Sequence, residues 1–244
     1  MNNQYSIFVV ILHYGKTEMT QRLHNQLVRS DPDLKEKILV LDNHAPEQYP
    51  QAWVRLLRNC YWGGALQWTM KKFQGSGCTH VWFLNNDIMF DCKPPIVGRA
   101  LQRLAWIEKN AGPVGIYSPS ALTNPYHQQM ISNRKYQYRI VQYIDGIAPM
   151  INLQCWSELE DLGIEENLIG YGVDNYFSLQ AREKGWNVVV DHQVTIKHDY
   201  HSTARRIKGF MKKAAQKKGV YLEKRLGSDY SRILNKKSLE YTDY

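Results

Sequence analysis

The chain has 244 residues and a mass of 28.5 kDa, and 43% of its residues are hydrophobic and 12% aromatic. This composition allows a substantial core in one large domain and excludes an intrinsically disordered chain. The formal net charge is +8 at pH 7, but nine of the 31 Lys and Arg residues lie between Arg205 and Arg225, beside a single acid, Glu223. The rest of the chain is balanced, with 22 basic and 22 acidic residues. We therefore expect a neutral domain with a basic C-terminal segment.

No early segment has the length of a membrane span or of a signal-peptide core. The apolar run from Ile7 to Leu12 is six residues long, and no basic region precedes it. The cysteines have no metal-ligand spacing; they are Cys60, Cys78, Cys92 and Cys155. We therefore expect reduced thiols in a cytoplasmic protein.

Apolar strand patterns alternate with helical repeats in the first half of the chain. The expected strands are residues 5–13, 37–41, 54–57 and 81–84, and the expected helices are residues 17–29 and 65–73. Such alternation indicates a parallel sheet with right-handed crossovers. Three successive expected strands end in polar or glycine-rich turns, which follow residues 41, 57 and 84. We expect these turns to share one edge of the sheet, and this edge is the candidate site.

The clearest of these turns follows the strand at residues 81–84. Asn85, Asn86 and Asp87 end this bulky apolar run abruptly. Carboxylate oxygens at the end of a buried strand suit a hard cation such as Mg²⁺ or Mn²⁺, which is often held together with substrate phosphates. Asn-Asn-Asp is also a common turn sequence, so the motif alone leaves both interpretations open.

The second half of the chain is less regular. We expect a helix from about residue 96 to 109, strands at 114–117, 146–153, 188–190 and 194–196, and helices at 155–162 and about 173–184. The tyrosine-rich residues 126–143 suggest a loop or an exposed antiparallel hairpin. The helix at 173–184 follows Gly170-Tyr171-Gly172, and Gly185 ends it.

Taken in order, these motifs resemble the glycosyltransferase family 2 enzymes, particularly their rhamnosyltransferase-like bacterial members, over residues 7–202. The matching pieces are the strand ending in Asp42-Asn43, the segment Asn59 to Ala65, Asn85-Asn86-Asp87, Gly172-Val173-Asp174 through Gly185-Trp186, and His198. The chain departs from the family at Asn85, where the first Asp of an Asp-x-Asp motif often stands, and at Val173, in place of a Glu. Tyr176 also occupies a position that is often acidic.

The resemblance implies an α/β domain of the A-type glycosyltransferase fold, with a mostly parallel central sheet flanked by helices. It further implies an inverting, metal-assisted enzyme that moves a sugar from a nucleotide-sugar donor to a hydroxyl of a glycan or lipid-linked acceptor. The metal would be Mn²⁺ or Mg²⁺. Polysaccharide biosynthesis is the process that such an activity would serve.

The resemblance also assigns roles to residues. Asp87 and His198 are the expected metal ligands, with His201 as a competitor for the second position. The donor site would contain Asp42, Asn43, Asn59, Gly63, Gly64, Asn85, Asn86 and Asp87. Asp174 is the expected general base. Its alternative role is that of a residue favoured by the start of a helix.

The acceptor site is the last part of the expected active site. Asp145 and Gly146 are expected to border it, together with Tyr171 and Gly172. Aromatic side chains pack against sugar rings, and Trp62, Tyr126 and Tyr171 are the candidates for this contact. Each of them could equally belong to the core.

Three alternatives remain beside a glycosyltransferase. A nucleotidyltransferase also pairs an α/β sheet with a carboxylate-bound metal, but the chain has no clear basic phosphate-binding motif near the first turn. A relative that binds nucleotide sugars without transferring them would fit the changes at Asn85 and Val173. A nucleic-acid-binding module would need basic residues interleaved with aromatic ones, whereas here the two groups lie apart, so we expect no nucleic-acid partner.

The basic segment is expected to be a helical extension, residues 204–244, beyond a catalytic domain of residues 1–203. One apolar stripe is formed by Ile207, Phe210, Met211, Ala214 and Ala215, and Gly219 would end the helix. The stripe could dock on the domain. Alternatively, residues 205–225 could hold the protein peripherally at an anionic membrane, on the cytoplasmic side.

Overall fold

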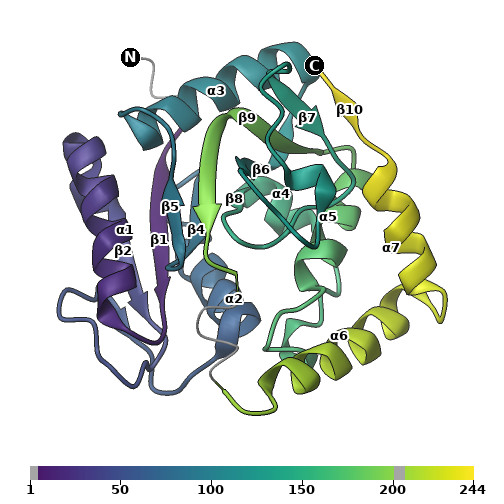
Figure 1. The fold of residues 1–244 in the computed structure, drawn as a ribbon, viewed down its shortest axis with the longest axis horizontal. Coiled ribbons are helices and arrows are strands. Elements are labelled where there is room, and N and C mark those ends of the chain that lie inside the picture. The colour runs from purple at the N-terminus through teal and green to yellow at the C-terminus, as the bar shows by residue number, and fades with distance from the viewer. Residues whose placement is uncertain (1–4, 201–206) are drawn as a thin grey trace.

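The computed structural model describes residues 5–200 and 207–244, which form one α/β domain around a ten-stranded sheet (Figure 1). The strands are β1 (Ile7–His13), β2 (Ile38–Asp42), β3 (Val54–Arg55), β4 (His80–Asn85), β5 (Ile88–Phe90), β6 (Val114–Ala121), β7 (Tyr138–Ile140), β8 (Met150–Asn152), β9 (Asn187–His198) and β10 (Thr242–Asp243). The helices are α1 (Thr17–Ser30), α2 (Tyr61–Phe73), α3 (Ile96–Ala111), α4 (Leu153–Glu158), α5 (Val173–Glu183), α6 (Phe210–Leu226) and α7 (Tyr230–Leu239). Short 3-10 turns lie at Pro32–Lys37, Gln128–Met130 and Ile164–Glu166.

The sheet order is β10-β7-β9-β6-β8-β4-β1-β2-β3, and β5 pairs with β9 off this path. β1 is parallel to β2 and β4, and β2 is parallel to β3, as the alternation of strands and helices predicts. Beyond β4 the sheet is mixed, because β8 runs antiparallel to both β4 and β6, while β6 and β9 are parallel. The ends of β1, β2 and β4 therefore share one edge.

Helices cover both faces of the sheet, and each face has its own hydrophobic core. Successive side chains of a strand point to opposite faces, so neighbouring residues of β1 enter different cores. Val10 packs in the cluster that contains Leu66 of α2, whereas Val9 packs in the cluster that contains Leu23 of α1. This two-sided burial explains the continuous apolar sequence of β1 and β4.

Several expected boundaries are wrong. α2 begins at Tyr61 instead of residue 65, so Gly63 and Gly64 lie in the first turn of the helix. The two short strands expected at 188–190 and 194–196 are one strand, β9, because an irregularity in its pairing with β6 absorbs the intervening polar residues. The strand found in residues 126–143 is β7, and it pairs with β9 and β10 instead of forming a local hairpin.

The C-terminal segment packs into the same core and sheet. Tyr221 and Leu222 of α6 and Leu234 of α7 are buried in the cluster on one face, and β10 forms an edge of the sheet. α6 was expected to end at Gly219, but it continues to Leu226, because the buried side chains beyond Gly219 outweigh the roughly 1 kcal/mol that glycine costs a helix. The expected domain boundary between residues 203 and 204 lies outside the described residues.

No helix in residues 5–200 and 207–244 is both long enough and apolar enough to cross a bilayer. All four cysteines are free thiols, and Cys155 is buried.

Candidate active site

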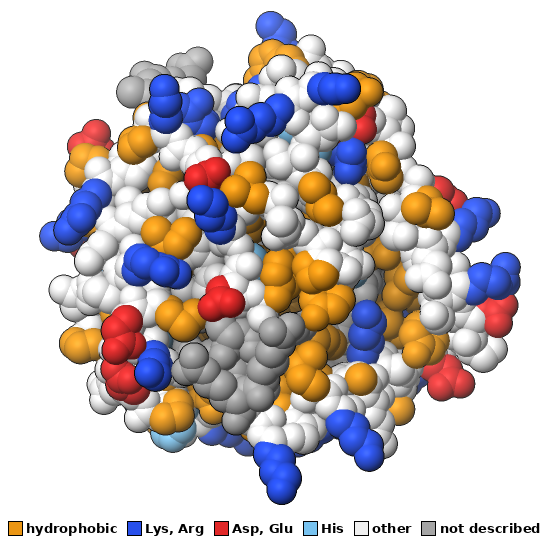
Figure 2. All heavy atoms as spheres, in the orientation of Figure 1, with side chains coloured by type: hydrophobic (Ala, Val, Ile, Leu, Met, Phe, Trp, Pro, Cys, Tyr) orange, Lys and Arg blue, Asp and Glu red, His pale blue; other side chains and the backbone are white. Residues whose placement is uncertain are grey.

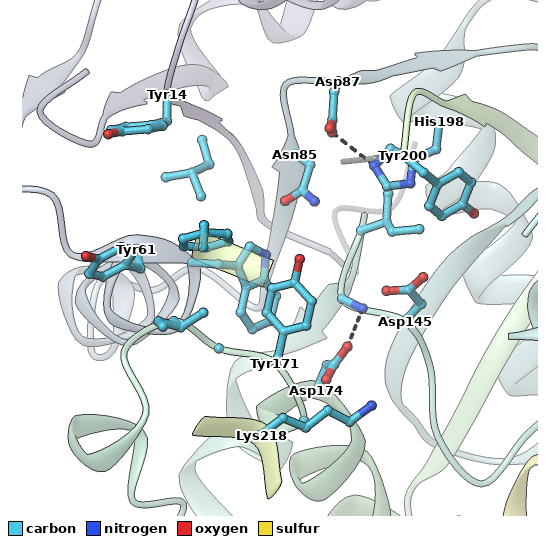
Figure 3. A pocket seen from close by; sticks show the side chains of 18 of the residues that line it. Tyr14, Tyr61, Asn85, Asp87, Asp145, Tyr171, Asp174, His198, Tyr200 and Lys218 are labelled. Atoms are coloured by element: carbon cyan, nitrogen blue, oxygen red, sulfur yellow. Dashed lines mark hydrogen bonds and ion pairs between the residues drawn. The ribbon is translucent and has the colours of Figure 1, made fainter. Parts of the chain in front are cut away.

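A cavity of about 520 Å³ opens where β1 and β4 end. Its walls come from these strand ends, from the start of α2, from the loops around residues 126 and 145, and from the starts of α5 and α6. The cavity brings together most of the predicted site residues: Asn43, Asn59, Asn85, Asn86, Asp87, Asp145, Gly146, Tyr171, Gly172, Asp174 and His198. Figure 3 shows several of them converging on one space.

The predicted metal ligands meet at one side of this cavity. Asp87 follows β4, His198 ends β9, and the Asp87 Oδ1 atom lies 3.1 Å from the His198 Nε2 atom (Figure 3). The contact follows from strand pairing, because Ile88 of β5 is opposite His198, and the Asp199 N–H donates to the Asp87 carbonyl at 2.9 Å. The backbone thus fixes the distance between the two side chains.

The two side chains fit a metal that is held jointly with a substrate. The Nδ1 atom of His198 is buried and has no hydrogen-bond partner among the described residues, so the hydrogen bond of the ring in the described structure is the one between its Nε2 atom and Asp87. The described residues contain no cluster of three or more His, Cys, Asp or Glu able to hold a metal by themselves. Phosphate oxygens and water, which usually complete the coordination of Mg²⁺ in nucleotide sites, would be suitable further ligands. His201, the competing candidate, lies outside the part of the chain that the structure describes.

Asp174 lies in the first turn of α5 and faces the same cavity (Figure 3). Its Oδ2 atom accepts a hydrogen bond from the Gly146 N–H at 2.8 Å, and its Oδ1 atom accepts one from the Asn175 N–H at 2.9 Å. Burial, and next the negative charge of Asp145, raise the pKa of the Asp174 carboxyl. A fixed carboxylate with a raised pKa can accept a proton from a hydroxyl beside it.

Asp145 stands between Asp174 and His198 in Figure 3 and is held by Asn124, which the sequence did not single out. The Asn124 Nδ2 atom donates to the Asp145 Oδ2 atom at 3.1 Å. The Asn124 Oδ1 atom accepts hydrogen bonds from the N–H groups of Tyr126 and His127, at 3.0 Å and 2.9 Å. One buried amide therefore positions both a carboxylate and two aromatic rings of the cavity wall.

Tyr171 lies across the cavity from Asn85 in Figure 3. Burial, followed by the charges of Asp145 and Asp174, raises the pKa of its hydroxyl to about 12. The phenol therefore stays neutral near pH 7, and it can pack its ring against a sugar while its hydroxyl forms hydrogen bonds. Gly172 precedes α5 with a φ of 87°, a left-handed conformation that favours glycine.

The asparagines predicted for the donor site also line the cavity. The Asn43 Oδ1 atom accepts from the Cys60 N–H at 2.8 Å, and the Asn59 Oδ1 atom accepts from the Tyr61 N–H at 2.7 Å, so both amides shape the loop before α2. The Asn86 Nδ2 atom donates to the Thr20 hydroxyl at 2.9 Å. These contacts hold the cavity wall and restrict the surface that a nucleoside could reach.

Three residues predicted for the donor site do not line the cavity. Asp42 is fully buried, and its carboxylate accepts hydrogen bonds from the Ala45 and Tyr49 N–H groups and pairs with Arg55 at 2.7 Å. Gly63 and Gly64 are covered by the loop before α5, and a Cβ added at Gly63 would lie 3.1 Å from the Leu168 carbonyl oxygen. The Asp42 carboxylate therefore holds the loop after β2 in place, and Gly63 and Gly64 allow the backbone of α2 to pack closely against the loop before α5.

The sequence reasoning missed two kinds of cavity residue. Tyr200 and His127 line the cavity, although the sequence assigned them no role; the Tyr200 ring lies 4.1 Å from the His198 ring, measured between centroids. The segment just before α6 and the start of this helix also line the cavity, through Ile207, Phe210 and Met211, and so does Lys218. The apolar stripe of this helix was recognised, but its position over the site depends on the tertiary fold.

No protein-family model matches the sequence, and no curated protein sequence matches it. Solved structures resemble the fold. GalNAc-T7 with UDP, GalNAc and Mn²⁺ superposes with a TM-score of 0.60 at 12% identity, covering 81% of this chain and 44% of that chain. The mannosyltransferase PcManGT from Pyrobaculum calidifontis, in complex with GDP-Man and Mn²⁺, gives a TM-score of 0.58 at 11% identity, covering 95% and 74% of the two chains. A mycobacterial protein gives a TM-score of 0.56 at 12% identity, covering 88% and 73%.

The chain spans less than half the length of the GalNAc-T7 chain. At these identities the likeness concerns the fold. The chain has the A-type glycosyltransferase fold, which confirms the fold that the sequence motifs imply.

Proposed function

We propose that the protein is an inverting, metal-assisted glycosyltransferase that moves a sugar from a nucleotide-sugar donor to a hydroxyl of a glycan or lipid-linked acceptor. The observation that carries this proposal is the meeting of Asp87, His198 and Asp174 in one cavity at the strand ends. The solved structures of similar fold support it, because two of them hold Mn²⁺ with a nucleotide or nucleotide sugar.

Asp87 and His198 would hold Mn²⁺ or Mg²⁺ together with the donor diphosphate. When bound, the metal would stabilise the negative charge of the departing diphosphate. Asn43 and Asn59 would border the nucleoside, and Asn85 and Asn86 would lie beside the ribose and diphosphate. Asp42 is left out of this assignment, since its carboxylate is fully engaged inside the fold.

Asp174 would take the proton of the acceptor hydroxyl as its oxygen attacks the anomeric carbon and the bond to the diphosphate breaks. A direct displacement of this kind inverts the anomeric configuration. Asp145, Gly146, Tyr171 and Gly172 would border the acceptor, because they surround the carboxylate that acts on it. The hydrogen bonds from Gly146 and Asn175 would keep the carboxylate fixed throughout.

A panel of nucleotide sugars, incubated with the protein and Mn²⁺ or Mg²⁺, tests the proposal. Release of nucleoside diphosphate that is abolished by EDTA would support a transferase, even where water serves as a slow acceptor. Release of pyrophosphate from nucleoside triphosphate and sugar phosphate would indicate a nucleotidyltransferase instead. Binding of nucleotide sugars without turnover, over a broad set of acceptors, would identify a binding protein.

The raised pKa of Asp174 predicts the acid side of the pH–activity profile. The ionised form accepts the proton, so kcat/KM should fall as the pH drops through a pKa above that of an ordinary Asp. Asp145→Asn removes a negative charge that raises the pKa of Asp174, so the acid limb should move to lower pH. Measuring kcat/KM of both proteins from pH 4 to 8 checks this, and an unmoved limb would contradict it.

We also propose that the protein is cytoplasmic and attaches peripherally to an anionic membrane through residues 205–225. Lys212, Lys213 and Lys217 are exposed on α6, and each could contribute about 1 kcal/mol near such a surface. We expect sedimentation with anionic liposomes at low salt, lost at high salt and in the Lys212→Gln/Lys213→Gln/Lys217→Gln variant. Deleting residues 205–244 is not a clean test, because it would remove Leu222 and Leu234 from the core. Equal binding to neutral liposomes would contradict the prediction.

A further inference from the structure

The first turns of α6 form an apolar wall of the cavity. Phe210 stacks on Tyr61, with ring centroids 6.3 Å apart, and the Met211 sulfur lies 4.0 Å from the Tyr171 hydroxyl. Ile207 lines the same cavity. Ile207 and Met211 are also 42% and 36% exposed, so the apolar wall continues from the cavity to the outer surface.

Figure 2 shows hydrophobic side chains gathered on the face of the molecule above α6. Such a wall would be poorly matched to a free sugar, which presents hydroxyl groups on most of its surface. It suits an alkyl chain, since each methylene removed from water contributes about 0.8 kcal/mol.

Lys218 lines the same cavity further along α6. It follows Met211 by two helical turns, so both side chains lie on one face of the helix. Figure 3 places it beside Asp174, on the side away from Asp87 and His198. Among the described residues Lys218 forms no hydrogen bond or ion pair, in contrast to Lys224 of the same helix, which pairs with Glu166 at 2.9 Å. An ammonium group is thus available next to the position proposed for the acceptor hydroxyl.

We propose that the acceptor is an amphiphile, a sugar linked through phosphate to a lipid chain, with Lys218 binding the phosphate and the Ile207–Phe210–Met211 wall binding the first part of the chain. This inference rests on the proposed function, because it places the acceptor beside Asp174. It adds that one helix recognises both chemical parts of the acceptor. A charge and an apolar wall on the same helix face match the two chemical parts of this class of molecule.

Binding of small probes tests the inference without turnover. The intrinsic tryptophan fluorescence, to which Trp62 of the cavity wall contributes, can be followed during titration with octyl phosphate, octyl glucoside and inorganic phosphate, in the presence of nucleoside diphosphate and Mn²⁺. Octyl phosphate should bind at least ~10-fold more tightly than either other probe, the scale of one hydrogen bond to a charged group. Lys218→Met should remove most of this advantage and leave octyl glucoside unchanged.

Matched variants away from the cavity serve as controls. Lys236→Met removes an exposed charge on α7 that does not line the cavity and should leave the binding of all three probes unchanged. Met211→Ser should weaken the binding of octyl phosphate and of octyl glucoside alike by ~10-fold. Val220→Ser, which changes a side chain that is 62% exposed, should weaken the binding of neither probe.

Three results would overturn the inference. Inorganic phosphate that binds as tightly as octyl phosphate would make Lys218 a site for free phosphate. A Lys218→Met variant that loses nucleoside diphosphate instead of octyl phosphate would place Lys218 in the donor site. If Lys218→Met binds all probes normally but the acid limb of its kcat/KM profile moves to higher pH, then Lys218 only lowers the pKa of Asp174. Because the probe and nucleoside diphosphate titrations need no sugar transfer, loss of the inference and loss of the proposed function are distinguishable.

Discussion

Asp174→Asn should lower the rate of sugar transfer by at least ~10²-fold, the usual contribution of a general base, while nucleoside diphosphate binding stays nearly intact. An amide cannot take the proton of the acceptor hydroxyl. It also carries a single oxygen, so it can accept from the Gly146 N–H or from the Asn175 N–H but not from both. We therefore expect a stability loss of about 1–3 kcal/mol beside the catalytic loss.

These two effects can be separated by measurement. Thermal unfolding and titration with nucleoside diphosphate report whether the variant is folded and whether the donor side of the cavity is intact. Asp91→Asn is the matched control, because it is the same chemical change at a carboxylate that pairs with Lys197 and does not line the cavity. A folded Asp174→Asn protein with near-normal turnover would remove Asp174 from the mechanism.

Asp87→Ala and His198→Ala should each weaken metal-dependent binding of nucleoside diphosphate by at least ~10-fold, since even residues that only support metal ligands contribute 10–100-fold to metal affinity. The two variants should resemble each other, because the pairing of Ile88 with His198 holds both side chains in one site. Isothermal titration with Mn²⁺ present, and again with EDTA, measures the metal-dependent part.

Asp91→Ala provides a control at the other end of β5. Asp91 pairs with Lys197 at 3.4 Å and does not line the cavity, so its loss should leave binding unchanged. Equal affinity with and without metal, together with normal binding by Asp87→Ala, would exclude the assignment of Asp87 and His198 as metal ligands.

The parallel half of the sheet could be predicted from sequence because its signals are local. β1 and β4 are buried on both faces, so their sequences are apolar without interruption, and polar residues mark where they end. The meeting of Asp87 with His198, 111 residues apart, could not be read from any local pattern. It was expected only because the order of motifs resembles a known family.

Other parts of the structure depend on packing that a linear pattern does not contain. Asp42 ends a strand at the expected edge, yet Arg55 and two backbone N–H groups turn its carboxylate inward. Gly219 was expected to stop a helix, but Tyr221 and Leu222 are buried just beyond it and keep the helix intact. In both cases a residue with a strong local preference serves a tertiary contact instead.

α6 joins a solvent-exposed first part to a firmly packed second part, and this has a consequence for its motions. Amide hydrogens around Tyr221 and Leu222 should exchange with solvent only when the whole domain unfolds, since these residues belong to the core. Amides near Lys212 and Lys213 lie among exposed side chains and should exchange through local opening. The helix would therefore fray from the cavity end while its other end stays anchored. A ligand held against Phe210 and Met211 should slow exchange in the first turns alone, which makes deuterium uptake along this one helix a direct record of whether the cavity is occupied.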